Sequence, residues 1–310
     1  MENNIYDLII VGIGPAGCMA SVYASRYKIN HFLIGMLPGG QISEAHKVCN
    51  FPGFNEITGM ELSQKMLDQV NGFGVERVVD RVKNISRDKN NNFVLETYAK
   101  NSYYAKSILL ATGASKSKLG LKRESDFVGK GISYCATCDA GFYAGKTVGV
   151  VGGSNSATTA ALVLSDIAKE VFIIYRGDKF KGDPTWIEQV EGKENITIVL
   201  NTNVVELEGQ EKLESVKLNN PYRGSDTLKL NGLFVEIGQS PDITLAGDLG
   251  IKLDERSHII VSPDQSTNIE GVFSAGDITT GSNGFRQVIT ACSEGAIAIE
   301  GIYKHLNSKT

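Results

Sequence analysis

The sequence feature that constrains the fold most is a glycine-rich turn that begins at Gly12. The apolar run of residues 6–11 before it is typical of a central strand in a parallel sheet, and the small residues of 18–26 after it are typical of a helix. Gly12, Gly14 and Gly17 have the G-x-G-x-x-G spacing of a dinucleotide-binding turn. Its first glycine allows a sharp bend, the second lets a pyrophosphate approach the backbone, and the third lets helix and strand pack closely. The pattern predicts an α/β domain with a Rossmann-like parallel sheet.

A second turn of this kind follows the apolar residues 147–151 and leads into an alanine-rich helical stretch that ends at Ser165. The chain therefore contains two related modules. The second turn departs from the pattern, because Ser154 stands where the middle glycine is expected and a side chain there crowds a pyrophosphate. The first module departs as well, because no acidic residue follows residues 31–34 to bind a ribose hydroxyl.

Between the two turns lies a Cys-x-x-Cys pair, Cys135 and Cys138, with Asp139 directly after it. Two thiols at this spacing can close a disulfide and exchange it with a partner, and a carboxyl group beside them can hold or supply the proton. The same spacing also serves as half of a zinc site. His46 and Cys49 have plausible spacing for the other half, so a zinc-binding protein remains an alternative on the residues alone.

The length of 310 residues suggests about two domains. The net charge of -4 gives no overall basic field, so we expect neither nucleic acid nor an anionic membrane as a general partner. The N-terminus passes into an apolar strand without a basic leader or a long apolar segment, which favours a cytoplasmic protein. Five cysteines with one close pair do not resemble a secreted disulfide framework.

Seven short motifs together resemble those of the low-molecular-weight thioredoxin reductases, and the resemblance covers essentially the whole chain. The motifs are Gly12-Ile13-Gly14-Pro15-Ala16-Gly17, Gly39-Gly40-Gln41, Asn50-Phe51-Pro52-Gly53, Ala111-Thr112-Gly113-Ala114, Cys135-Ala136-Thr137-Cys138-Asp139, Gly276-Asp277 and Arg286-Gln287. The resemblance implies two Rossmann-like, three-layer ββα domains: an FAD-binding domain of residues 1–116 and 244–310, and an inserted domain of residues 117–243 that carries the Cys pair. It also implies a homodimer, and domain rotation about hinges near residues 115–119 and 238–243.

The resemblance assigns roles to individual residues. Asp277 would accept a ribityl hydroxyl, and Arg286 and Gln287 would approach the polar edge of the flavin. Cys138 would receive electrons from the flavin, Cys135 would attack the disulfide of thioredoxin, and Asp139 would be the acid. The remaining FAD contacts implied are Gly12, Gly14, Pro15, Ala16, Gly17, Gly39, Gly40, Gln41, Asn50, Ala111, Thr112, Gly113 and Gly276.

The chain departs from the family at the electron donor's site: the family's NADPH module has a basic His-Arg-Arg cluster, and this chain has Tyr175-Arg176-Gly177 there. Together with Ser154, this change favours the branch of the family that takes electrons from ferredoxin. A basic docking patch is then expected at Lys116, Lys118, Lys122 and Arg123. The alternative is an NADPH-dependent thioredoxin reductase that uses Arg176, Lys179 and Lys181. A flavin-binding redox sensor without turnover is a more remote alternative.

Overall fold

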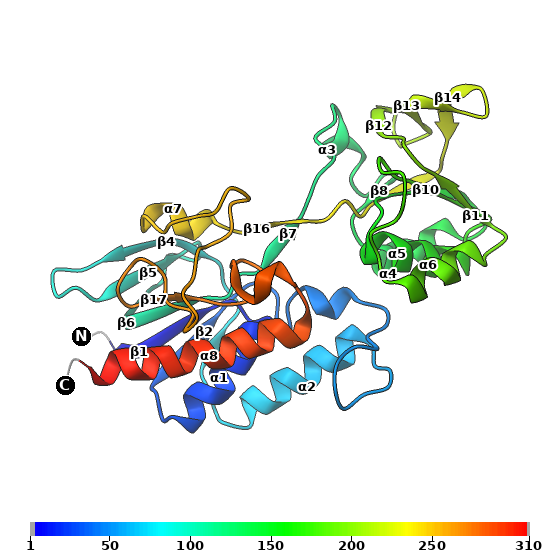
Figure 1. Cartoon of the computed structure of the whole chain (residues 1–310). Helices are drawn as coiled ribbons and strands as arrows, with labels where there is room; N and C mark the ends of the chain where they lie inside the picture. Colours follow the sequence, from blue (N-terminus) through cyan, green and yellow to red (C-terminus); the bar gives the residue numbers. More distant parts are fainter. Residues whose placement is uncertain (1–3, 309–310) are drawn as a thin grey trace. The chain divides into compact units, whose positions relative to one another are not determined.

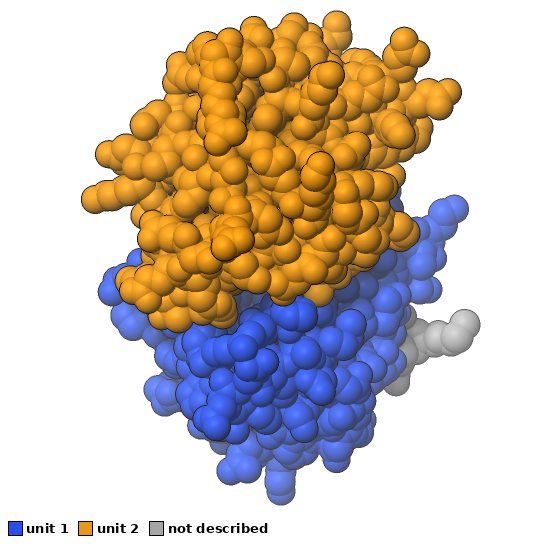
Figure 2. All heavy atoms as spheres, turned by 90° about the vertical axis from the view of Figure 1, so that its right-hand side faces the viewer, with its two compact units in different colours: residues 1–115, 241–310 blue, residues 116–240 orange. Residues whose placement is uncertain are grey.

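The computed structural model of the chain describes residues 4–308. The chain divides into two compact units, one of residues 1–115 and 241–310 and one of residues 116–240 (Figure 2). Two short strands lie at the breaks, β7 (Ala114–Lys116) and β16 (Gln239–Pro241), and they pair with each other. The breaks lie close to the boundaries after residues 116 and 243 that the sequence predicts. Each unit has its own sheet and its own hydrophobic core.

The first unit is built on a seven-stranded sheet of order β3-β2-β1-β6-β5-β4, with β17 also paired to β6 (Figure 1). Its strands are β1 (Ile5–Val11), β2 (His31–Ile34), β3 (Arg77–Val78), β4 (Val82–Arg87), β5 (Phe93–Thr97), β6 (Ser102–Leu110) and β17 (Val272–Ser274). The pairings among β1, β2, β3, β6 and β17 are parallel, whereas β4 and β5 join in antiparallel register.

Both faces of β1 are buried, which explains its unbroken apolar sequence. Leu8 and Ile10 belong to the core on the side of three helices, and Ile9 and Val11 belong to the core on the opposite side with the short helix α7 (Figure 1). The helices of this unit are α1 (Pro15–Arg26), α2 (Gly59–Asn71), α7 (Thr244–Asp248) and α8 (Val288–Asn307), with 3-10 turns at η1 (Gln41–Glu44) and η3 (Gly281–Gly284).

The second unit has a five-stranded parallel sheet of order β11-β10-β9-β15-β8 between a layer of helices and a three-stranded antiparallel sheet. Its parallel strands are β8 (Ile132–Ser133), β9 (Thr147–Val151), β10 (Glu170–Ile174), β11 (Ile196–Val199) and β15 (Gly232–Val235), and its antiparallel strands are β12 (Val204–Glu208), β13 (Ser215–Tyr222) and β14 (Ser225–Lys229). The helices are α3 (Glu124–Phe127), α4 (Ala136–Asp139), η2 (Ala140–Tyr143), α5 (Asn155–Ser165) and α6 (Pro184–Glu191).

The predicted α/β class with two Rossmann-like sheets is confirmed. Some boundaries differ for physical reasons. The first helix begins at Pro15 rather than at residue 18, because the fixed φ angle of proline suits the first helical position. The strand β15 ends at Val235, and the chain then bends through Gly238, whose φ angle is +105°. Within the described residues, the helices are too short or too polar to cross a membrane.

Candidate functional site

Four parallel strands of the first unit end side by side. In the register of the sheet, Val11 pairs with both Ile34 and Leu110, and Leu110 pairs with Ser274. The turns that follow β1, β6 and β17 therefore meet at one edge of the sheet. Three of the sequence motifs lie in these turns: the glycine-rich turn after β1, Ala111-Thr112-Gly113 after β6, and Gly276-Asp277 after β17. The carboxyl edge of such a sheet is where α/β proteins bind their ligands.

Steric fit explains two of the glycines. Gly12 has a φ angle of +123°, and a Cβ atom there would overlap the carbonyl oxygen of Ala111. A Cβ atom at residue 17 would overlap the carbonyl oxygen of Gly12. The first glycine therefore lets β1 and β6 end together, and the second lets α1 start directly against the turn.

The start of α1 fits a dinucleotide pyrophosphate. Its N-cap residue is Gly14, which has no side chain, and no acidic residue stands in the first helical turn. Gly40 lies against Gly14 so closely that a Cβ atom at residue 40 would be 2.7 Å from the Gly14 Cα. Gly39 fixes this loop by donating its N–H to the carbonyl oxygen of Ile13 at 2.8 Å. Backbone amides and the helix dipole at such an N-terminus favour an anionic ligand.

Other predicted residues also come together in this unit. The side chain of Asn50 donates to the Gln287 side chain at 3.0 Å, and the side chain of Gln41 donates to the carbonyl oxygen of Ala114. Gln287 is the N-cap of α8. The structure thus gathers motifs from both ends of the chain around the same edge of one sheet.

Asp277 and its neighbours form a polar cluster after β17. Burial raises the pKa of the Asp277 carboxyl, the Arg286 guanidinium acts in the opposite direction, and the Glu294 carboxylate adds to the rise. Arg286 also donates to the backbone carbonyl of Asp277 at 3.2 Å. Sequence reasoning missed Glu294, a buried carboxylate whose only sequence signal is an acidic residue within the small, mostly apolar residues of α8.

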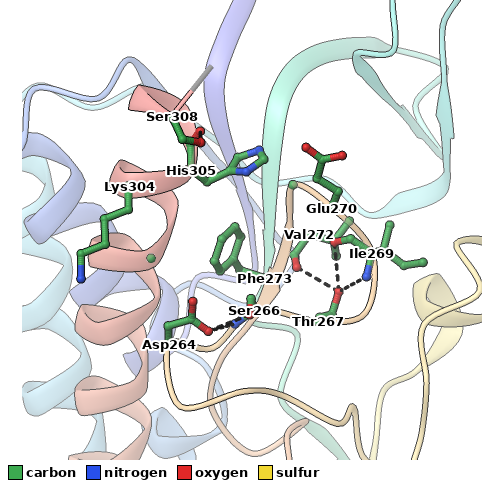
Figure 3. A pocket seen from close by; sticks show the side chains of 12 residues that line it. Asp264, Ser266, Thr267, Ile269, Glu270, Val272, Phe273, Lys304, His305 and Ser308 are labelled. Atoms are coloured by element: carbon green, nitrogen blue, oxygen red, sulfur yellow. Dashed lines mark hydrogen bonds between the residues drawn. The ribbon is translucent and has the colours of Figure 1, made fainter. Parts of the chain in front are cut away.

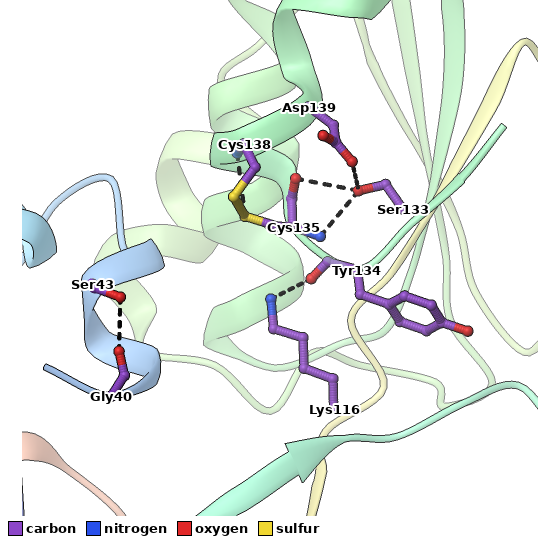
Figure 4. Close-up of a disulfide and its surroundings, with 8 residues drawn as sticks. All are labelled: Gly40, Ser43, Lys116, Ser133, Tyr134, Cys135, Cys138 and Asp139. Atoms are coloured by element: carbon purple, nitrogen blue, oxygen red, sulfur yellow. Dashed lines mark hydrogen bonds between the residues drawn. A yellow bond between two sulfur atoms is a disulfide. The ribbon is translucent and has the colours of Figure 1, made fainter. Parts of the chain in front are cut away.

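The second unit carries the redox pair. Cys135 and Cys138 form a disulfide with their Cα atoms 5.3 Å apart, as the sequence predicts (Figure 4). Cys135 is the N-cap of α4, and the backbone N–H of Cys138 points to its sulfur at 3.2 Å. Asp139 ends this helix, and its Oδ2 atom accepts a hydrogen bond from the Ser133 hydroxyl at 2.7 Å.

The residue before the disulfide is held by a second buried carboxylate that sequence reasoning also missed. Glu124 accepts the Tyr134 hydroxyl at 2.6 Å and the backbone N–H groups of Leu119 and Gly120, each at 2.8 Å. Burial and then this carboxylate raise the pKa of the Tyr134 phenol. These contacts fix the backbone that leads into Cys135.

The glycine-rich turn of the second unit repeats the hydrogen bonds of the first. Gly12 donates to the carbonyl of Ile34 at 2.8 Å, and Gly152 donates to the carbonyl of Ile174 at 3.1 Å. Both glycines have positive φ angles, +123° and +147°. A Cβ atom at residue 152 would overlap the carbonyl oxygen of Glu236, the residue that follows β15, as one at residue 12 would overlap Ala111.

The repetition extends to the loop that crosses in front of each turn. Lys181 donates its N–H to the carbonyl oxygen of Gly153 at 2.7 Å, as Gly39 does to that of Ile13. Ser154 is the N-cap of α5 with φ of -108° and ψ of -175°, close to the -85° and -172° of Gly14. The serine therefore keeps the backbone of the cradle without strain.

Part of the predicted basic patch is engaged within the second unit. Lys116 donates to the carbonyl oxygen of Tyr134. Arg123 donates to the carbonyl oxygens of Gly209 and Gln210, at 2.8 and 3.2 Å, and lies over the Phe127 ring. Two of the four cations of the patch thus bind backbone carbonyls of their own unit, which leaves Lys118 and Lys122 as its other members.

The zinc alternative loses two of its four proposed ligands, because Cys135 and Cys138 are bonded to each other. In the part of the chain that the structure describes, no group of three or more His, Cys, Asp or Glu side chains is arranged to hold a metal ion.

A pocket of about 370 Å³ lies elsewhere in the first unit, at the opposite end of β17 (Figure 3). Its lining comes from the segment before β17 and from the end of α8, and includes Asp264, Thr267, Phe273, Lys304 and His305. None of the residues that the sequence predicts for the site lines it.

Comparison with known proteins gives a consistent result. The family model described as "Pyridine nucleotide-disulphide oxidoreductase" matches residues 6–295. A thioredoxin reductase of Mycoplasma genitalium is 42% identical over 298 residues, covering 95% of this chain and 93% of its own. A thioredoxin reductase of Bacillus subtilis is 35% identical over 98% of this chain and 96% of its own. The crystal structure of Lactococcus lactis thioredoxin reductase matches with a TM-score of 0.92 and 33% identity, over 98% of this chain and 99% of that one.

The expectation of ferredoxin as the electron donor is wrong. The similar curated proteins named thioredoxin reductase, including those of Mycoplasma genitalium and Bacillus subtilis, carry no reference to ferredoxin in their names. A ferredoxin-flavin thioredoxin reductase of Clostridium acetobutylicum is a more distant structural match, with 30% identity and a TM-score of 0.52 over 98% of both chains. The sequence argument took Ser154 and Gly177 as signs of an eroded nucleotide site, whereas the backbone of that site is intact.

Proposed function

Since the chain belongs to the pyridine nucleotide-disulphide oxidoreductase family, among the low-molecular-weight thioredoxin reductases, we propose that it reduces thioredoxin with electrons from NADPH. Its cofactor is FAD. The observation that carries the choice of donor is the repeated cradle: the turn from Gly152 to Asn155 has the backbone conformation and hydrogen bonds of the turn that begins at Gly12. A chain with two such cradles has room for two dinucleotides, FAD and a pyridine nucleotide.

FAD, when bound, passes an electron pair from the nucleotide to the disulfide. In this proposal the first unit holds it at the carboxyl edge of its sheet. The start of α1 and Gly40 receive the pyrophosphate, and Asp277 accepts a hydrogen bond from a ribityl hydroxyl. Arg286 and Gln287 approach the polar edge of the flavin. The other contacts proposed are Pro15, Ala16, Gly39, Gln41, Asn50, Ala111, Thr112, Gly113 and Gly276.

The Cys135–Cys138 pair transfers the electrons to thioredoxin. Two electrons break the Cys135–Cys138 bond, and one proton converts one of the two sulfurs to a thiol. The N–H of Cys138 already points to Cys135 Sγ, so it stabilises a thiolate there. Asp139 supplies and later recovers the proton. Cys135 then attacks the disulfide of thioredoxin, Cys138 displaces the mixed disulfide, and thioredoxin leaves as a dithiol while the enzyme disulfide re-forms.

In this proposal, NADPH binding depends on the loop after β10. Arg176, Lys179 and Lys181 lie exposed on this loop, and their charges suit the 2′-phosphate of NADPH. A basic residue cannot replace Gly177 while Tyr175 keeps its position, because a Cβ atom at residue 177 would lie 2.6 Å from the Tyr175 ring. We therefore expect preference for NADPH over NADH with fewer phosphate contacts than the family pattern provides.

The test is anaerobic mixing of the FAD-loaded protein with NADPH or with NADH while the flavin absorbance is followed. We expect NADPH to bleach the flavin at lower concentration than NADH, and to support turnover with thioredoxin. Lys179→Ala should raise the NADPH concentration needed by about three- to tenfold, a loss of roughly 1 kcal/mol for one exposed phosphate contact. A flavin that stays oxidised in excess NADPH would refute the donor assignment.

We further propose that the protein acts as a homodimer. The support is a row of exposed apolar side chains at the start of and along α8, namely Phe285, Ile289 and Ile297, which are 63%, 41% and 37% exposed. Light scattering coupled to size-exclusion chromatography tests this: we expect twice the mass of one chain, and the monomer mass would contradict it.

A further inference from the structure

Ser133 lies close to the disulfide in sequence but has no role in the proposed reaction. It is the last residue of β8, paired with Phe234 of β15, and its side chain is buried. Its hydroxyl donates to Asp139 Oδ2 at 2.7 Å and accepts the backbone N–H of Cys135 at 3.0 Å (Figure 4). The carbonyl oxygen of Cys135 lies 3.2 Å from the same hydroxyl. One buried oxygen thus connects the acid to the backbone of a disulfide cysteine.

We propose that Ser133 is a positioning residue for the disulfide exchange, holding the Asp139 carboxyl group in one orientation at the end of α4, the helix that carries Cys138. Asp139 stands at the end of a helix of four residues, where its side chain can adopt several rotamers. Among the residues that the structure describes, the Ser133 hydroxyl is the hydrogen-bond partner of that carboxylate. Because Ser133 is held in the sheet, its hydrogen bond restricts the side chain of Asp139 to one position.

Ser133 assists the attack of a thiolate on the disulfide. An incoming thiolate attacks one sulfur of the disulfide, the S–S bond breaks, and its electron pair stays on the other sulfur. That sulfur takes a proton from the Asp139 carboxyl group, which is reprotonated from solvent. The Ser133 hydroxyl donates to Oδ2, which leaves Oδ1 as the oxygen available to hold the proton. Ser133 itself transfers no proton.

This inference rests on the proposed role of Asp139, but its test needs neither NADPH nor thioredoxin. The FAD-loaded full chain is mixed with dithiothreitol and quenched with a maleimide in denaturant. Mass spectrometry then counts the two newly freed thiols against the constant background of Cys18, Cys49 and Cys292. The rate of disulfide cleavage is measured for Ser133→Ala, Asp139→Asn, the double variant and Ser133→Thr.

We expect Ser133→Ala to slow cleavage about tenfold, less than the roughly 10²–10⁴-fold that a positioned acid contributes, because Asp139 itself remains. The double variant should be no slower than Asp139→Asn alone, because the two residues act as one unit. Ser133→Thr keeps the hydroxyl and should restore most of the rate. Ser165→Ala is the matched control, since Ser165 is also buried in this unit and donates one hydrogen bond, to the Leu162 carbonyl at 2.7 Å.

Two results would overturn the inference: a wild-type rate for Ser133→Ala, or losses that simply multiply in the double variant. A protein that fails to respond to NADPH but shows the coupled loss would refute the proposed donor and leave the role of Ser133 standing. If Ser133→Ala does not fold, the comparison of Ser133→Thr with Ser133→Cys decides, because cysteine fits the same space but is a weak donor. Equal rates for these two would then contradict the inference.

Discussion

Glu294 is a buried carboxylate on α8 whose hydrogen bonds hold the loop that carries Asp277. It accepts the backbone N–H of Gly276 at 2.8 Å, the Thr279 hydroxyl at 2.9 Å and the Ser282 hydroxyl at 2.6 Å. No basic side chain forms an ion pair with it among the described residues. Three donors take the place of a counter-ion, so at the scale of single residues the shape of the proposed FAD site depends on this side chain.

We predict that Glu294→Ala weakens FAD binding about tenfold or more and lowers the free energy of unfolding by roughly 2–4 kcal/mol. The reason is that two or three buried donors lose their acceptor, each at a cost of about 1–3 kcal/mol. FAD affinity is measured by titrating the apoprotein and following flavin fluorescence.

Glu300→Ala is the matched control for this prediction, because Glu300 lies on the same helix, is exposed, and pairs with Lys304 on the surface. It should change FAD affinity by less than about twofold. If Glu294→Ala retained FAD as tightly as Glu300→Ala does, the loop would not depend on this carboxylate.

At the scale of elements, each glycine-rich turn is tied to the loop after the next strand by one backbone hydrogen bond. In the second unit this bond runs from the N–H of Lys181 to Gly153, and a second one from the N–H of Asp183 to the side chain of Asn155 at 2.6 Å. The loop therefore carries its lysines at a fixed distance from the start of α5. We infer that the loop is part of the nucleotide cradle.

We predict that Lys181→Pro weakens NADP⁺ binding about fivefold more than Lys181→Ala does. Both variants lose the charge, and only proline loses the N–H that bonds to Gly153, a bond worth about 1 kcal/mol. Calorimetric titration with NADP⁺ measures the difference, and the FAD content of both variants should equal that of the wild type. Equal affinities for the two variants would show that the bond does not shape the cradle.

The sequence predicted those helices and strands whose residues are required by the backbone conformation. The glycines of the first turn identified β1 and α1, because steric fit allows little else there. The antiparallel strands β13 and β14 follow from no motif in the sequence, because polar residues such as Asn219 and Asn220 interrupt the pattern of β13. Glu294, Glu124 and Ser133 escaped prediction because a buried polar residue is recognised only when its partners, which come from distant segments, are known.

At the scale of the whole molecule, the chain repeats one backbone arrangement at the glycine-rich turns of its two units. Two units repeat one cradle, and each adds its own chemistry: a polar cluster around Asp277 in the first unit and a disulfide with an acid in the second. The ferredoxin prediction failed at this scale. That prediction relied on the identity of the residues at 154 and 177. The cradle is formed by backbone N–H groups and by the backbone conformation, which the residue types alone do not give.

We propose above all that the Cys135–Cys138 disulfide passes electrons from FAD to thioredoxin. The most direct measurement compares Cys135→Ser and Cys138→Ser with the wild type in two assays, bleaching of the bound flavin by NADPH and steady-state reduction of thioredoxin. We predict that both variants keep FAD and bleach, but that thioredoxin reduction falls to the uncatalysed background. Cys49→Ser, which removes an exposed thiol outside the disulfide, should reduce thioredoxin at the wild-type rate. Thioredoxin reduction within about tenfold of the wild type in either disulfide variant would contradict the claim.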